Sequence, residues 1–136
     1  MKILVCCSKH FYSQIKEVSE VLELSGHEIS FPNSYDDPFM EEKLKEMSAE
    51  EHVEWKAMMM RKDESNIEPQ DAILVLNFEK KGIPNYIGGA TFLEIYTAWK
   101  MDKKIFFHNL LPRCSFTDEL KGINPMIING DLEMIK

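Results

Sequence analysis

The sequence has 136 residues, of which 44% are hydrophobic and 29% are charged, and its net charge at neutral pH is -7. This length and balance predict a single globular domain over residues 1–136. The acidic excess argues against a nucleic-acid polymer or an anionic membrane as the main partner. A small phosphorylated ligand stays possible, because backbone N–H groups can hold one phosphate.

Cysteine and histidine usage suggests a cytoplasmic protein without a metal. The three cysteines, Cys6, Cys7 and Cys114, form no CxxC motif, which is typical of reduced thiols. The four histidines are scattered and have no metal-site spacing. The N-terminal apolar run ends too early for a signal peptide, and no run approaches the ~20 residues of a membrane helix. We therefore expect a cytoplasmic protein with no membrane partner.

The start of the chain predicts a strand, a helix and a second strand. Residues 2–7 form a β-branched and apolar run that is typical of a buried strand. Apolar residues recur at helical spacing over 14–24, and Gly26 is the expected C-terminal cap of that helix. Residues 28–31 predict a shorter strand, and a loop at 32–38 follows it.

The middle of the chain is strongly charged and helical in pattern. Residues 39–67 predict a helical region that is interrupted near Ser48, where Ser48 and Glu51 have the spacing of a new helix start. The continuous apolar run at 71–77 predicts a strand that is covered on both faces.

The last third continues the alternation. A polar loop over 78–86 leads through two glycines into a predicted helix at about 90–101. Strands are predicted at 104–108 and 125–129, with a short helical turn at 116–121 between them.

Alternating strands and helices predict a parallel sheet with right-handed crossovers. The predicted fold class is α/β, a flavodoxin-like three-layer sandwich with a five-stranded parallel sheet in the order 2-1-3-4-5. In such sheets, ligands bind beyond the carboxyl ends of the strands where the strand order reverses. The loops at 8–12 and 77–89 are therefore expected to form one site.

Two acidic residues are candidates for chemistry at that site. Gly88 and Gly89 let a ligand approach the backbone closely, and the helix that starts there offers free N–H groups and a partial positive charge. Glu94 follows in this helix and is the candidate reactive group, unless it is a solvated glutamate favoured by the helix dipole. Asp63, near the end of the charged helix, is the second candidate, unless it is one of many exposed acids.

Polar and aromatic residues of the two loops are candidates for ligand contact. A hydroxyl could hold a phosphate, aromatic rings could stack on a base, and an amide could bind a sugar or base. Each of these side chains could instead lie on the surface or pack within its loop. The candidates are Ser8, His10, Phe11, Tyr12, Asn77 and Tyr86.

Three stretches, Ile3–Gln14, Trp55–Leu76 and Gly88–Ile95, resemble the nucleoside 2-deoxyribosyltransferase family, including its relatives that hydrolyse deoxynucleoside 5′-monophosphates. The third stretch resembles the family segment that ends in a nucleophilic glutamate. The resemblance implies that Glu94 attacks the anomeric carbon of a 2-deoxyribose, expels the base, and passes the sugar to another base or to water. It also implies that Asp63 protonates the leaving base or orients the nucleophile.

The resemblance further implies a small-molecule nucleoside or nucleotide as the partner, no cofactor, and a homo-oligomer. The position six residues before Glu94 is Gly88, where family transferases commonly have an acid. This difference favours the alternative of a non-catalytic nucleotide-binding or sensing module with the same fold. A flavin mononucleotide carrier is a weaker third possibility, because the loop after the first strand lacks a hydroxyl-rich phosphate cradle.

Overall fold

The structure, a computed structural model, describes residues 1–136. Its five strands form one parallel sheet in the order β2-β1-β3-β4-β5. This result confirms the predicted fold class and the predicted strand order. The strands are β1 (Lys2–Cys6), β2 (Glu28–Ser30), β3 (Ala72–Val75), β4 (Lys104–Phe107) and β5 (Met126–Ile127).

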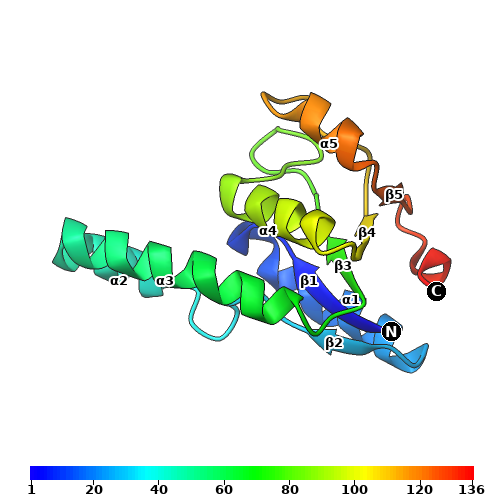
Figure 1. The fold of residues 1–136 in the computed structure, drawn as a ribbon, viewed down its shortest axis with the longest axis horizontal. Helices are drawn as coiled ribbons and strands as arrows, with labels where there is room; N and C mark the ends of the chain where they lie inside the picture. Colours follow the sequence, from blue (N-terminus) through cyan, green and yellow to red (C-terminus); the bar gives the residue numbers. More distant parts are fainter.

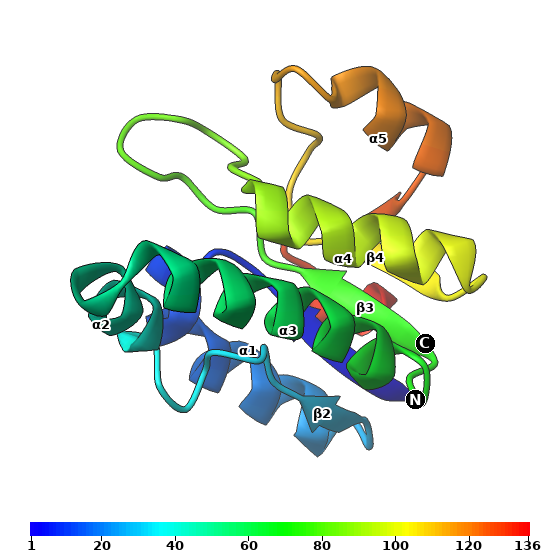
Figure 2. The ribbon, with the colours of Figure 1, turned by 60° about the vertical axis from the view of Figure 1, so that its left-hand side comes forward.

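Helices cover both faces of the sheet (Figure 1). One face packs against α1 and the C-terminal turn η2, and the other packs against α3, α4 and α5. In Figure 2, α3 and α4 run side by side in front of the sheet, and the two helices are in contact. The helices are α1 (Tyr12–Leu24), α2 (Met40–Met47), α3 (Ala49–Ile67), α4 (Gly89–Lys100) and α5 (Thr117–Ile123), with 3-10 turns η1 (Lys9–Phe11) and η2 (Leu132–Met134).

The alternation of side chains along β1 builds two cores. Ile3 and Val5 point toward α1, whereas Leu4 and Cys6 point toward α3 and α4, and all four side chains are buried. Every residue of β3 is buried as well, because helices cover both of its faces. The continuous apolar run that predicted this strand therefore reflects its central place in the sheet.

Local chemistry sets the helix ends as the sequence predicted. The Ser48 hydroxyl accepts a hydrogen bond from the Glu51 backbone N–H at 3.2 Å, so Ser48 is the N-cap of α3. Gly26 follows the end of α1 with a φ of +92°, a conformation that glycine adopts without strain.

The α2–α3 segment extends past the sheet. Figure 1 shows α2 and the N-terminal half of α3 projecting to one side of the strands. Ile67, at the end of α3, is the one residue of this long helix that is fully buried. The projecting half therefore serves as a wall above the sheet edge rather than as core. None of the helices combines the length and apolar character needed to cross a bilayer.

Candidate active site

A cavity of about 380 Å³ lies at the carboxyl ends of β1, β2 and β3. Its walls come from the loops that follow these strands, from α3, and from the first turns of α4. This is the edge where the strand order reverses, and it is where the sequence predicted a site. The residues proposed from the sequence that line the cavity are Ser8, Tyr12, Asp63, Tyr86, Gly88, Gly89 and Glu94.

Glu94 is almost fully buried at this cavity, with 8% of its surface exposed. Burial, and after it the charge of Asp63, raise the pKa of its carboxyl group to about 8, although a hydrogen bond from the Cys6 thiol acts in the opposite direction. A carboxyl group with this pKa is mostly protonated at neutral pH when the cavity holds no ligand. Burial of this kind is costly, and it is typical of residues kept for chemistry.

Asp63 reaches the same cavity from α3. Burial raises the pKa of its carboxyl group to about 6, and the nearby ammonium of Lys56 opposes this rise. The side-chain amide of Asn33 donates a hydrogen bond to the Oδ1 atom of Asp63. Asn33 belongs to the loop after β2, so this loop and α3 meet at the carboxyl group.

The two carboxyl groups form a coupled pair. The charge on Asp63 raises the pKa of Glu94, because two negative charges in one poorly hydrated site repel each other. Protons leave such a pair in two steps that belong to both groups. Between these two steps the pair holds one proton, so that one group can act as an acid while the other is ionised and can act as a nucleophile. No cluster of three or more His, Cys, Asp or Glu side chains is arranged to hold a metal ion.

The N-terminus of α4 forms an electropositive end of the cavity. Gly88 is the N-cap of this helix and no side chain caps it, so the N–H groups of the first turn are available to a ligand. A side chain built at Gly89 would meet open space, which leaves the backbone accessible. Ser8, Lys9 and Lys80 line the same cavity and add a hydroxyl and two ammonium groups. This combination suits an anion such as a phosphate.

Tyr86 occupies the space next to Gly88. A Cβ atom at position 88 would lie 3.3 Å from the Tyr86 hydroxyl oxygen and 3.6 Å from a ring carbon. The ammonium of Lys80 lies 4.6 Å from the centre of the Tyr86 ring, within range of a cation–π interaction. A larger residue at position 88 would therefore press on Tyr86, and glycine lets the tyrosine stay against the helix start.

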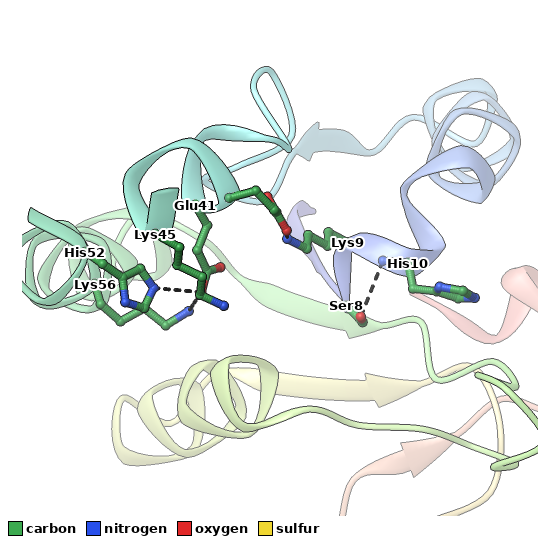
Figure 3. A network of polar contacts seen from close by, with 8 residues as sticks. Ser8, Lys9, His10, Glu41, Lys45, His52 and Lys56 are labelled. Atoms are coloured by element: carbon green, nitrogen blue, oxygen red, sulfur yellow. Dashed lines mark hydrogen bonds and ion pairs between the residues drawn. The ribbon is translucent and has the colours of Figure 1, made fainter. Parts of the chain in front are cut away.

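A polar network forms the outer wall of the cavity. Glu41 of α2 accepts hydrogen bonds from His52 at 3.1 Å and from Lys56 at 3.4 Å, and Lys45 lies 3.6 Å away (Figure 3). Partial burial raises the pKa of Glu41, but His52, Lys56 and Lys45 together outweigh it and lower the pKa. Glu41 thus stays ionised and joins α2 to α3.

A second contact joins α2 to the loop after β1. Lys9 forms an ion pair with Glu42, the neighbour of Glu41 on α2, and both side chains are partly exposed. Each exposed ion pair contributes little to stability. Together with the Glu41 network, this pair places α2 beside the mouth of the cavity, where Glu41 and Lys9 both line the wall.

Three residues proposed as ligand contacts lie elsewhere. Phe11 is 1% exposed and packs edge-to-face on Phe78 in the core at 5.5 Å. Asn77 is completely buried, and its amide bonds the carbonyl groups of Asn109 and Leu110 at 3.1 and 2.9 Å. Its side chain therefore joins the end of β3 to the loop after β4.

His10 is exposed on η1 and does not line the cavity that contains Glu94. It lines a neighbouring shallow hollow together with Phe39 and Lys81. His10, Phe11 and Asn77 therefore do not line the cavity that contains Glu94.

Several cavity residues were not proposed from the sequence. The most informative are Asn33, Glu41, Trp55, Lys56 and Met59. Asn33 follows the carboxyl end of β2, so the sheet-edge rule could have found it. The other four lie on helices, and only the packing of α2 against α3 and of α3 over the sheet edge brings them to the cavity.

A second hollow, of about 480 Å³, lies between α4 and α5. It is larger and more apolar than the first, and its lining includes Leu93, Tyr96 and Trp99. Glu119 is its one charged residue. Because it contains no coupled titratable groups and lies away from the strand ends, it is the weaker candidate for a reaction site.

Comparison with known proteins bears on the fold. No family model matches the sequence, and a search of curated proteins also finds no match. Among solved structures, the chain matches the Clostridium botulinum CMP N-glycosidase BcmB with a TM-score of 0.54 and 17% sequence identity. The match covers 99% of this chain and 98% of that chain. The two proteins share one fold. The full-length match confirms the fold that the resemblance to the nucleoside 2-deoxyribosyltransferase family implied.

Proposed function

We propose that the protein cleaves the N-glycosidic bond of a 2-deoxynucleoside or its 5′-monophosphate, with Glu94 as nucleophile and Asp63 as proton donor. The observation that carries this proposal is the pair of interacting carboxyl groups, Glu94 buried and Asp63 half-buried, which α4 and α3 bring to one cavity at the sheet edge. The fold shared with a CMP N-glycosidase supports the same class of reaction.

The proposed reaction begins with attack of a Glu94 carboxylate oxygen on the anomeric carbon. The carbon–nitrogen bond breaks, its electron pair goes to the base, and Asp63 gives the base a proton. The sugar is then held as an ester on Glu94 until water or a second base displaces it. The negative carboxylate also stabilises the positive charge that develops on the sugar in the transition state.

The two pKa values describe how the pair must change on the way to reaction. In the empty cavity the proton resides mainly on Glu94, whose pKa of about 8 exceeds the value of about 6 for Asp63. Attack requires the reverse arrangement, with Glu94 ionised and Asp63 protonated. Positive charge developing on the sugar beside Glu94 favours ionisation of Glu94, and leaves Asp63 as the group that holds the proton.

A 5′-monophosphate fits the cavity better than an uncharged nucleoside. The uncapped start of α4 offers backbone N–H groups, and Ser8, Lys9 and Lys80 line the same cavity. The protein carries a net charge of -7, so these cations are local features rather than part of a general basic surface. They support an anionic substrate, which agrees with the nucleotide named for the structurally similar glycosidase.

The test is chromatography of deoxynucleosides, ribonucleosides and their 5′-monophosphates after incubation with the protein, with and without a free acceptor base. We expect free base from the wild-type protein, and at least a ~1,000-fold slower release from Glu94→Gln, because the nucleophile is lost. Glu79→Gln, an exposed glutamate outside the cavity, is the matched control and should match wild type. A Glu94→Gln variant with wild-type turnover would contradict the assigned role.

A non-catalytic nucleotide-binding module is the second candidate. The pKa of about 8 for Glu94 favours it, because a neutral carboxyl group is a weak nucleophile. This candidate predicts that calorimetry detects a monophosphate binding to both wild type and Glu94→Gln, while no substrate in the panel releases a base. Base release by wild type alone would exclude it.

A further inference from the structure

The hydrogen bonds around Asp63 treat its two carboxyl oxygens differently. Oδ1 accepts a hydrogen bond from the Asn33 side-chain amide. Oδ2 has no hydrogen-bond partner in the protein. It is also not enclosed by other atoms, unlike the buried polar atoms that lack a partner. Since Asp63 lines the cavity, Oδ2 is the oxygen left for a ligand or for solvent.

The orientation of the Asn33 amide is set by its surroundings. Its Nδ2 atom lies 3.3 Å from the backbone carbonyl oxygen of Met59, which can only accept a hydrogen bond. The Oδ1 atom of Asn33 in turn accepts a hydrogen bond from the side-chain amide of Asn66. Both N–H groups of Asn33 are thus directed, one to Met59 and one to Asp63, and the reverse orientation would place the Asn33 oxygen against the Met59 carbonyl oxygen.

We propose that Asn33 is a positioning residue that keeps the acidic proton of Asp63 on Oδ2, the oxygen that faces the leaving base. A proton on Oδ1 would compete with the Asn33 N–H for the same oxygen, so the neutral acid carries its proton on Oδ2. In the reaction this proton passes from Oδ2 to a basic atom of the base, which receives the electron pair of the broken carbon–nitrogen bond. This inference rests on the proposed function for its catalytic part, whereas the placement of the proton does not.

Asn33 also has an electrostatic effect on Asp63 that can be measured without substrate. A hydrogen-bond donor aimed at a carboxylate stabilises its ionised form, so loss of the donor raises the pKa of the carboxyl group. Lys56 also acts on the pKa of Asp63, and the titratable groups that line or adjoin the cavity all stay in place when Asn33 changes. These groups are Glu94 of α4, Lys56 of α3, Glu41 of α2, Tyr12 at the start of α1, Cys6 and Cys7 at the end of β1, and Lys9 and Lys80 of the adjoining loops.

The first experiment is a ¹³C NMR titration of the Asp63 carboxyl carbon in the ligand-free protein. We expect the midpoint to rise by about one pH unit in Asn33→Leu, which keeps a similar size and removes the donor. Asn33→Asp keeps the shape of the side chain and places a like charge beside Asp63, so the midpoint of Asp63 should rise further in this variant. This variant also serves as the test if Asn33→Leu folds poorly. Asp36→Asn, an exposed change in the same loop, is the control and should leave the midpoint unaltered. Equal midpoints in wild type and both Asn33 variants would overturn the proposal.

The second experiment measures base release from a nucleoside 5′-monophosphate as a function of pH. We expect kcat of Asn33→Leu to fall about tenfold with KM within about twofold of wild type, since proton transfer is misdirected while the binding groups remain. The limb of its pH profile that reflects Asp63 should move upward with the NMR midpoint. A fall in kcat without this movement would assign Asn33 a purely structural role. Absence of base release by wild type would refute the proposed function, and the NMR titration would still decide the role of Asn33.

Discussion

The two faces of α4 differ in a way that reverses the usual arrangement of a surface helix. The face toward the sheet and cavity buries Thr91, Glu94 and Ile95, including a carboxyl group. The opposite face exposes Leu93, Tyr96 and Trp99, each with more than two-fifths of its surface in contact with solvent. An amphipathic helix that packs only for stability would bury its aromatic residues and expose its acid.

This reversal separates stability from function within one helix. Ile95 and Ala98 provide the packing on the sheet, so α4 is held without help from its aromatic residues. Glu94 is buried at an energetic cost that its packing does not explain, which is typical of a group retained for chemistry. The exposed face is apolar and adjoins the hollow between α4 and α5, where Phe92 stacks on Phe116 at 4.4 Å.

The largest effect on the buried face of α4 is expected when Asp63, the partner of Glu94, is changed. We expect Asp63→Asn to lower kcat/KM for base release about 100-fold, because the leaving base loses its proton donor. The pKa of Glu94, followed by ¹³C NMR of its carboxyl carbon, should also fall below its wild-type value, since the charge of Asp63 no longer raises it. Asp102→Asn, at the far end of α4, is the control. An unshifted pKa of Glu94 would mean that the two carboxyl groups act independently.

A smaller effect should appear in stability. The pKa of Glu94 rises from 4.5 to about 8 on folding, so the folded state holds this proton more tightly than the unfolded state. The free energy of unfolding of wild type therefore falls as the pH increases from about 4.5 to 8. Glu94→Gln has no such proton, and we expect it to be more stable than wild type by about 2 kcal/mol at pH 8 and by little at pH 5. Urea unfolding at both pH values, with Glu79→Gln as control, measures the difference; a constant offset would contradict the assigned pKa.

The smallest effect is expected on the exposed face. Leu93→Ser should change the free energy of unfolding by less than about 0.5 kcal/mol, because this side chain is already largely in water. Ile95→Val, a much smaller chemical change two residues away, should cost about 1 kcal/mol because Ile95 is fully buried. A costly Leu93→Ser would show that this face is covered in solution.

Light scattering on the same proteins tests the predicted homo-oligomer, for which a mass above 15.9 kDa is expected.

Local sequence patterns were sufficient for the fold. The unbroken apolar run of β3, the Ser48 cap and the glycine after α1 each depend on near neighbours in the chain, and all three predictions are confirmed. The sheet-edge rule then located the cavity, because the carboxyl ends of parallel strands must lie together. Glu94 was found by its place after two glycines at a helix start, and its presence in the cavity follows from the same local geometry.

The roles of individual loop side chains depended on contacts between distant residues. Phe11 and Asn77 follow strands just as Ser8 does, but one enters the core and the other joins two loops, which only the packed structure decides. Asn33 lies 30 residues from Asp63 in the chain, and their contact exists because α3 lies beside the loop that follows β2. The sequence by itself thus determined the strand order and the sheet edge at which the cavity lies, and it placed Glu94 at that edge. The tertiary structure decided which polar groups surround that acid, because burial and hydrogen-bond partners are properties of the assembled chain.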